Sequence, residues 1–318
     1  MSWFDKLTGV QETSPDEVRR QLVVDRESMR SLANGRRLVC GRLETPSLCE
    51  LRARVGEFSG GRTTLREVVA DVQQLHVENA EALFQVASQF NLLEMVSPGM
   101  TPEYGVGIYE RDKTQGPACA IACGAGTIYR NYFVPANGKV GQSADNQIDC
   151  LADVGAALGG GLWQMRNGYA MAFEEGLRVI ARHPDLGSLR ELLRIGVHWN
   201  TQVTLNGSNE HLVSQAYCSA LPVAYSMLEA DLWAPFGRMV LEAAYEATLC
   251  AAVLNARATG NRTVFLTLLG GGAFGNPIKW ILDAIARGLG LFREAGLDCA
   301  IVSYRSPNLF VRELVARY

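Results

Sequence analysis

The strongest candidate for chemistry in this chain of 318 residues is the glycine-rich stretch "TLLGGGAFGNPIKW" at residues 267–280. A hydrophobic run leads into three consecutive glycines, and Asn276 and Pro277 then open a predicted helix. A loop of this kind presents backbone N–H groups beside a helix N-terminus, where a phosphate group is bound favourably. The stretch therefore predicts a phosphate-binding site.

Three interpretations of this loop are open. A structural turn needs fewer glycines than the three adjacent ones found here. A dinucleotide-binding loop fits G-x-G-x-x-G at Gly270, Gly272 and Gly275, and Tyr304 lies where a following strand would meet an adenosine ribose. That interpretation lacks the acidic residue expected about 20 residues further on. The third interpretation is a diphosphate-binding loop of another α/β nucleotide-binding fold.

The elements around the loop indicate an α/β protein with a mixed sheet. A strand at 263–269, a helix at 277–295 and a strand at 298–305 form a predicted right-handed βαβ unit. Cap-and-proline signals predict helices from Ser14 and from Thr45. Further patterns predict a helix near 64–75, strands at 36–44, 82–90, within 118–134 and at 195–205, and helices over 212–258.

A long irregular stretch, residues 92–116, separates two of these predicted elements and is named the acid loop below. Loops of this length in compact domains are usually functional or disordered. The many aromatic and apolar residues of the acid loop argue against disorder. It carries four acidic residues, Glu94, Glu103, Glu110 and Asp112. Glu94, Glu103 and Asp112 follow one another at intervals of nine residues.

The sequence resembles the macrodomain family in several blocks. "FLTLLGGGAFGNPIKWILDAI" is similar to the second phosphate loop of macrodomains, in which a strand runs into a Gly-Ala-aromatic-Gly loop and a helix. "GRLETPSLCELR" resembles the early strand that is followed by an adenine-binding acid, and "ALFQVASQFNLLEM" resembles the strand that ends in a ribose-binding asparagine. "AIVSYRSPN" resembles the last strand, which ends in an aromatic residue stacked on adenine.

This resemblance implies a three-layer α/β/α fold with a mixed central sheet and added helices, binding ADP-ribose. It implies that Glu44 binds adenine, that Asn91 contacts the distal ribose and that Tyr304 stacks on adenine. Phe274 would lie against the proximal ribose. The diphosphate would be bound by the glycine loop, which consists of Gly270, Gly271, Gly272, Ala273, Phe274, Gly275 and Asn276.

The acid loop departs from the usual family pattern. It replaces the glycine-rich catalytic loop of macrodomains, and the Gly-Gly-Gly…Gln-Glu-Glu signature of poly(ADP-ribose) glycohydrolases is missing. The pattern is most similar to a divergent glycohydrolase-like group that includes bacterial effector hydrolases acting on ADP-ribosylated ubiquitin. Hydrolysis at the anomeric carbon of ADP-ribose requires carboxylates for acid–base chemistry. We expect Asp112 first, Glu103 second and Glu94 third in this role, against the alternative that they are solvated loop charges.

Composition limits the other functions. A net charge of −3 without a basic run argues against nucleic-acid binding. No apolar leader and no run of transmembrane length is evident, so a cytoplasmic protein without a membrane partner is expected. The eight scattered cysteines predict reduced core residues, and the four histidines lack metal-ligand spacing. Neither a metal nor a cofactor is expected.

The sequence thus predicts an N-terminal helical extension at residues 1–35 and a macrodomain-like catalytic domain with helical insertions at 36–318. The expected function is removal of ADP-ribose from a modified protein, with ADP-ribosylated ubiquitin as one candidate. A non-catalytic ADP-ribose reader is the first alternative. An NAD(P)-dependent oxidoreductase is the second.

Overall fold

The computed structural model describes residues 1–318 and is built on one mixed seven-stranded sheet. β11 runs antiparallel to both of its neighbours, and all other pairs are parallel. Most strands therefore end at the same edge of the sheet. The order is β4 (Arg42–Glu44), β11 (Gly196–Gln202), β12 (Leu212–Cys218), β6 (Leu83–Ala87), β13 (Thr263–Leu266), β14 (Asp298–Ser303) and β5 (Thr64–Val69).

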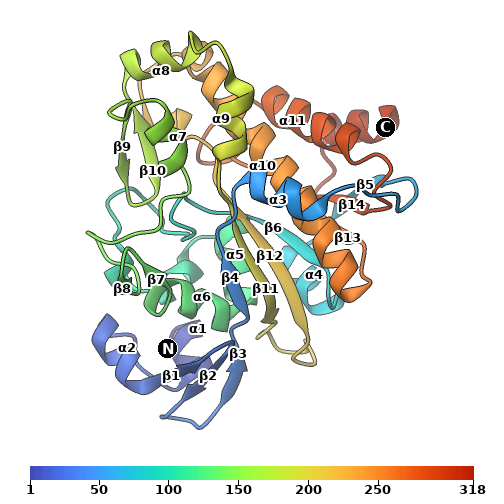
Figure 1. Ribbon diagram of the computed structural model, residues 1–318. Helices are drawn as coiled ribbons and strands as arrows, with labels where there is room; N and C mark the ends of the chain where they lie inside the picture. Colours follow the sequence, from blue (N-terminus) through green and yellow to red (C-terminus); the bar gives the residue numbers. More distant parts are fainter.

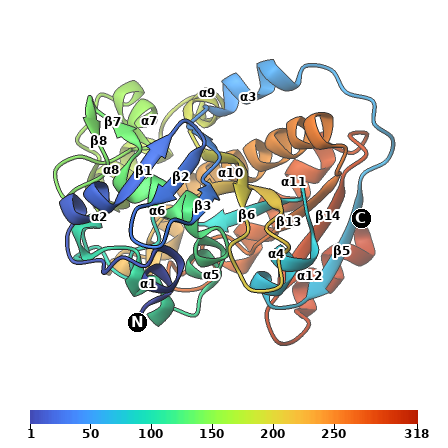
Figure 2. The same ribbon diagram turned by 90° about the horizontal axis from the view of Figure 1, so that it is seen from below.

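Helices cover both faces of this sheet, as Figure 2 shows. Successive residues of β6 point to opposite layers: Phe84 stacks on His76, with ring centroids 3.7 Å apart, and Gln85 donates a hydrogen bond to Thr248. One layer contains α3 (Leu48–Val55), α10 (Ala230–Thr259) and α11 (Ile278–Leu291), and the other contains α4 (Val72–Glu78), α5 (Gln115–Ala122) and α6 (Gly124–Tyr132). The predicted three-layer α/β/α class with a mixed sheet is confirmed.

The central helix α10 runs uninterrupted for 30 residues, through Pro235. By length and composition alone it is the one helix that could cross a membrane, yet 83% of its most apolar window is buried inside the fold. Glu246 of α10 is paired with Arg52 of α3 and Arg287 of α11, which ties this helical layer together. α10 is therefore the buried central helix of the layer that it forms with α3 and α11. α12 (Leu309–Arg317) packs beside β5.

Three segments differ from the sequence prediction. Residues 64–69 form the strand β5 rather than part of a helix, and residues 212–218 form the strand β12 rather than a helix. Residues 118–134 are largely the helices α5 and α6, although strands were predicted there. Short apolar runs are ambiguous between strand and helix. β12 is buried on both faces, which removes the alternation that identifies a strand, whereas the edge strand β5 alternates between exposed and half-buried residues.

The N-terminal residues form a small unit against the acid loop, drawn in blue in Figure 1. It contains more than the predicted helices, because a three-stranded antiparallel sheet follows them. Its 16-residue hydrophobic cluster is shared with α5, α6 and the acid loop. The elements are α1 (Trp3–Thr8), α2 (Pro15–Gln21), β1 (Leu22–Asp25), β2 (Ser28–Ser31) and β3 (Arg37–Val39).

A second addition lies between α6 and β11. It begins with a short hairpin and continues with a second hairpin that reaches the end of β6, where Phe90 donates its N–H to the oxygen of Gly168. Its elements are β7 (Pro135–Ala136), β8 (Lys139–Val140), α7 (Ala152–Ala157), β9 (Trp163–Arg166), β10 (Tyr169–Ala172), α8 (Glu174–Ala181) and α9 (Leu186–Leu192). Single 3-10 turns are η1 (Pro102–Tyr104), η2 (Gly107–Arg111) and η3 (Val223–Tyr225).

Candidate active site

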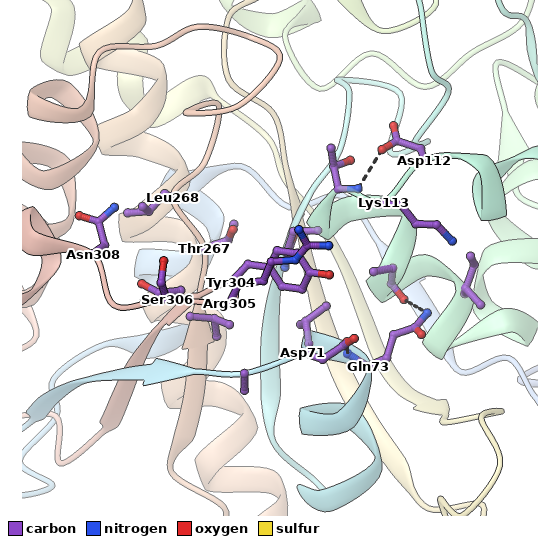
Figure 3. Close-up of a pocket in the computed structure, with 18 of the residues that line it drawn as sticks. Asp71, Gln73, Asp112, Lys113, Thr267, Leu268, Tyr304, Arg305, Ser306 and Asn308 are labelled. Carbon is purple, nitrogen blue, oxygen red and sulfur yellow. Dashed lines mark hydrogen bonds between the residues drawn. The ribbon is translucent and has the colours of Figure 1, made fainter.

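Two adjoining cavities lie outside the carboxyl ends of β6, β13, β14 and β5, and together they are named the groove. The large cavity has a volume of about 940 Å³ and the small cavity about 220 Å³. Both are lined by Asp112, Thr114, Gln115, Thr267 and Leu268, so they form one continuous site. Figure 3 shows the large cavity between the strand ends and the turn that carries Asp112. Ligands of open α/β sheets commonly bind at this edge.

The glycine loop brings unpaired backbone donors to the small cavity. Gly275 and Asn276 donate their N–H groups to carbonyl oxygens within the loop, and Gly271 donates to Leu268 O just before it. The N–H groups of Gly272, Ala273 and Phe274 have no hydrogen-bond acceptor in the protein, and all three residues line the small cavity. Three consecutive free donors are suited to the oxygens of a phosphate.

The glycines of this loop serve different purposes. Gly270 and Gly275 have φ angles of 74° and 69°, and a Cβ atom there would lie 2.4 Å and 2.6 Å from the Cβ atoms of Ala220 and Ala224. These two are required by the fold. Gly272 has no positive φ, and a Cβ atom on it would meet nothing within 4 Å. Its missing side chain leaves space in the cavity.

Asn276 and Phe274 hold the loop in this shape. The Asn276 side chain donates to Leu221 O at 2.8 Å and lies away from the cavity. The ring of Phe274 contacts Tyr169 and Tyr225, with centroids 5.1 Å and 5.8 Å away. These three aromatic residues form one side of the small cavity. An apolar surface beside free donors is suited to a sugar next to a phosphate.

The N-terminus of α5 faces the glycine loop across the small cavity. Gln115 ties this helix to β6, because its Oε1 accepts from Ala87 N and its Nε2 donates to Gln85 O. Gly116 allows the close approach, since a Cβ atom there would lie 1.9 Å from Ala87 O. The N–H groups of Gln115 and Gly116 donate to no protein acceptor. The positive end of the helix thus adds to the anion-binding character of the cavity.

Glu94 lines the same cavity, and its carboxyl group is buried. Its residue is 2% exposed, and neither carboxyl oxygen has a hydrogen-bond partner. Burial raises the pKa of Glu94 to about 7, against the opposing effect of Arg130. A buried polar group without a partner is costly and calls for an explanation. A buried carboxyl group whose pKa is raised to near neutral pH, on a residue that lines a cavity, is a candidate general acid or base.

Arg130 lies next to Glu94, and contacts with several other residues hold its side chain in place. Its Nη2 lies 3.5 Å from Glu94 Oε2, and its guanidinium lies 3.7 Å from the ring centroid of Tyr217. Its Nε donates to Leu92 O, and Nη2 donates to Thr127. Arg130 and the neighbouring His198 are both buried, and the arginine lowers the pKa of His198 in addition to the effect of burial. This places one fixed positive charge beside the acid.

Asp112 lies where the two cavities meet. It is half-buried, and its Oδ1 accepts from Thr114 N at 2.8 Å in a turn that leads into α5. Glu94 and Asp112 therefore line one cavity from different environments, the first buried and the second partly open to solvent. Pairs of carboxyl groups in such unequal surroundings divide acid and base roles in glycoside-cleaving enzymes.

The large cavity contains groups that suit a nucleoside. Tyr304 follows β14 and is 58% exposed, and the guanidinium of Arg305 lies 5.0 Å from its ring centroid. Asp71 follows β5 and lines the same cavity, as Figure 3 shows. Sequence reasoning missed Asp71 because residues 64–75 were interpreted as one helix. The run "TLREVVAD" could have indicated the strand, because it contains β-branched residues and is half-buried. It ends in an acidic residue, in the position where a strand delivers a side chain to a site.

Of the predicted site residues, Gly271, Gly275 and Asn276 of the glycine loop line neither cavity, and three others lie apart from both the loop and the groove. Glu44 pairs with Arg42 and Arg54 and accepts from Trp199, on the edge strand β4. Asn91 is buried, where it donates to Gln147 and accepts from Leu93 N. The exposed Glu103 accepts from Ala144 N. The structure gives each of them a local hydrogen-bonding partner and does not bring them to Glu94, Asp112, Tyr304 or the glycine loop.

Comparison with known proteins finds similarity among solved structures only. No protein-family model matches the chain, and no curated protein matches it. Poly(ADP-ribose) glycohydrolase from Thermomonospora curvata is similar with a TM-score of 0.47 and 13% identity, over 95% of each chain. The glycohydrolase from Deinococcus radiodurans in complex with ADP-ribose has a TM-score of 0.44 and 11% identity, over 87% of this chain and 92% of that chain.

Proposed function

We propose that this chain hydrolyses the bond between ADP-ribose and a modified side chain of a protein. The observation that carries the proposal is one groove that contains free phosphate-binding donors and a buried carboxyl group, which has Arg130 as a charge partner but accepts no hydrogen bond. The donors are the N–H groups of Gly272, Ala273 and Phe274, and the carboxyl group is that of Glu94. A ligand with a diphosphate and a sugar bond to be cleaved matches both.

The two cavities suggest how ADP-ribose would lie. The diphosphate would bind the glycine loop and face the N-terminus of α5, where both the free N–H groups and the helix dipole favour negative charge. The adenosine would occupy the large cavity, with adenine on Tyr304 and its amino group near the carboxylate of Asp71. The distal ribose would then lie in the small cavity, which Glu94 also lines, so that Phe274 lies beside this ribose and not beside the proximal ribose that the resemblance implied.

The reaction uses the two acids in different roles. As the bond from the anomeric carbon to the carrier atom breaks, the protonated Glu94 gives its proton to that leaving atom. A water molecule forms the new bond to the anomeric carbon, and Asp112 accepts its proton. The products are free ADP-ribose and the unmodified side chain. Arg130, which lies 3.5 Å from Glu94, stabilises the carboxylate left after proton transfer.

The carrier that we propose to assay first is ADP-ribosylated ubiquitin, because the sequence resembles hydrolases of that substrate. The decisive experiment measures ADP-ribose released from modified protein by the full chain and by Glu94→Gln. Release by the wild type alone, with ADP-ribose bound by both, would support the proposal. Binding of ADP-ribose without release by either would indicate a reader, and binding of NADP in preference to ADP-ribose would indicate the oxidoreductase alternative.

A further inference from the structure

Glu12 links the N-terminal unit to the acid loop. It lies between α1 and α2, and its carboxylate accepts three hydrogen bonds from distant residues. Tyr132 Oη donates at 2.7 Å, Val106 N at 2.8 Å and Gly107 N at 2.7 Å. The two backbone donors stand at the beginning of η2. Glu12 therefore caps this turn from outside, much as an N-cap side chain caps a helix from within.

The acid loop is shaped to admit this carboxylate. A Cβ atom at Gly105, whose φ is 80°, or at Gly107 would lie 2.6 Å from Glu12 Oε2. Any residue other than glycine at either position would push the carboxylate away from the N–H groups that it accepts from. Glu12 and the two glycines thus form one fitted contact between segments that are more than 90 residues apart in the sequence.

Trp3 holds the same turn at both ends. Its Nε1 donates to Val106 O at 3.0 Å, before η2 begins, and its backbone N donates to the carboxylate of Glu110 at 3.2 Å, near the end of η2. Glu110 and Trp3 also line the large cavity. The N-terminal unit therefore holds η2 through both Glu12 and Trp3.

Tyr109 of η2 contacts the backbone of both proposed acids. The hydroxyl of Tyr109 accepts from Glu94 N at 3.1 Å. Asp112 is the residue that ends η2, and its N–H donates to Tyr109 O at 3.1 Å. A shift of this single turn would therefore move Glu94 and Asp112 together, while the glycine loop, which belongs to β13 and α11, would stay in place.

We propose that Glu12 is a positioning residue of the active site, which acts through η2 to fix Glu94 and Asp112 relative to the glycine loop. The inference rests on the proposed function for the role of the two acids. Loss of the carboxylate would leave Val106 N and Gly107 N without their acceptor and release the beginning of the turn. Misplacement of catalytic groups by about 1 Å costs on the order of a hundred-fold in rate.

The test compares Glu12→Gln with the wild-type full chain. Glutamine keeps the size of the side chain but replaces one of its two acceptor oxygens with an NH₂ group, so at least one of the three donors loses its acceptor while the unit still packs. We expect kcat for ADP-ribose release to fall about ten- to a hundred-fold, with the dissociation constant of ADP-ribose changed less than about two-fold. Asp25→Asn, at an exposed carboxylate of the same unit, is the matched control and should leave both values unchanged.

Gly107→Ala should disrupt the same contact from the acid loop, because the added methyl group would displace the Glu12 carboxylate. If Glu12 acts through this contact, the double variant should be no slower than the slower single variant. Full additivity of the two losses would overturn the proposal. A folded Glu12→Gln variant with kcat within two-fold of the wild type would also overturn it, as would an equal loss of binding and turnover.

Hydrogen exchange separates this inference from the proposed function. Amide exchange at residues 94 and 105–112 should become faster in Glu12→Gln and stay unchanged in the glycine loop. If the wild type releases no ADP-ribose, the proposed function fails by that result alone. Faster exchange at Glu94 would then still support the coupling through η2, whereas unchanged exchange would overturn it.

Discussion

The two sides of the groove are built in different ways. The glycine loop joins a buried strand of the central sheet directly to α11, and its free donors are backbone groups shaped by Gly270 and Gly275. Between β6 and α5 the acid loop forms only the two short 3-10 turns η1 and η2, and the groups that it contributes to the site are the side chains of its acidic residues. The acid loop depends on distant partners, among them Glu12, Trp3 and Arg130.

In the proposed function, the glycine loop binds the ligand and the acid loop carries out the chemistry. Backbone N–H groups on a rigid element keep their positions when distant side chains change, because the local path of the chain alone determines these positions. A pair of acids on an irregular loop is fixed only as well as its surroundings hold it. We therefore expect substitutions on the acid side to change turnover and substitutions on the glycine side to change affinity.

The largest effect should follow from Glu94→Gln. Loss of the general acid is expected to lower kcat by about 10²–10⁴-fold, with the affinity for ADP-ribose nearly unchanged. Single-turnover release of ADP-ribose and calorimetry measure the two quantities. Thermal melting must accompany them, because the substitution leaves Arg130 without its charge partner. A folded variant with wild-type kcat would remove Glu94 from the mechanism.

The glycine side is tested by Gly272→Val. Nothing within 4 Å hinders a side chain there, so the fold should be retained while the branched side chain fills the space assigned to the diphosphate. Overpacking of about 1–3 kcal/mol predicts roughly ten- to hundred-fold weaker binding of ADP-ribose. Gly290→Ala in α11, which is equally unobstructed, is the matched control. Unchanged affinity would mean that the diphosphate binds elsewhere.

A smaller loss of affinity is expected at the far end of the groove. Tyr304→Ala removes the proposed stacking surface for adenine and should weaken ADP-ribose binding roughly ten-fold, with kcat at saturation unaffected. Leu309→Ala serves as the control, because Leu309 is also an exposed apolar residue but does not line the large cavity. Equal effects of the two substitutions would argue against adenosine in this cavity.

The pH dependence of turnover should reflect Glu94. Burial raises its pKa to about 7, and the protonated form is the active one in the proposed mechanism. The fraction of protonated Glu94, and with it kcat, should therefore fall as the pH rises, roughly halving between pH 6 and pH 7. This fall should be missing from any residual activity of Glu94→Gln. A wild-type profile that is flat from pH 6 to pH 8 would contradict the assignment.

The smallest effect is expected from Glu103→Gln. The carboxylate of Glu103 accepts from Ala144 N at the protein surface, outside both cavities. Its substitution should change kcat less than two-fold, although the sequence ranked Glu103 above Glu94. A loss comparable with that of Glu94→Gln would show that the acid loop rearranges when substrate binds.

The part of the site that local sequence determines was predictable, and the part made by distant contacts was not. The glycine loop follows from one continuous pattern of strand, glycines and helix, and the mixed α/β sheet follows from the elements around it. The exposed or buried state of the four loop acids depends on residues as far away as Arg130, so sequence alone could not place Glu94 ahead of Glu103. Asp71 was missed through one error, a strand interpreted as a helix.

The N-terminal unit illustrates the same limit. The cap signals of α2 are visible in "SPDEV", and the structure confirms that helix at Pro15–Gln21. The partner of Glu12 could not be inferred, because Gly105 and Gly107 lie in a loop whose path is set only by tertiary packing. Whether residues 1–35 form a separate domain stays a prediction, and their shared hydrophobic cluster joins them closely to α5 and α6.

The most direct test of the central claim is the crystal structure of Glu94→Gln with ADP-ribose bound. We predict diphosphate oxygens within about 3 Å of the N atoms of Gly272, Ala273 and Phe274, with the anomeric carbon of the distal ribose facing residue 94. Adenine should lie on Tyr304. A diphosphate bound away from the glycine loop, or a distal ribose pointing away from residue 94, would contradict the account.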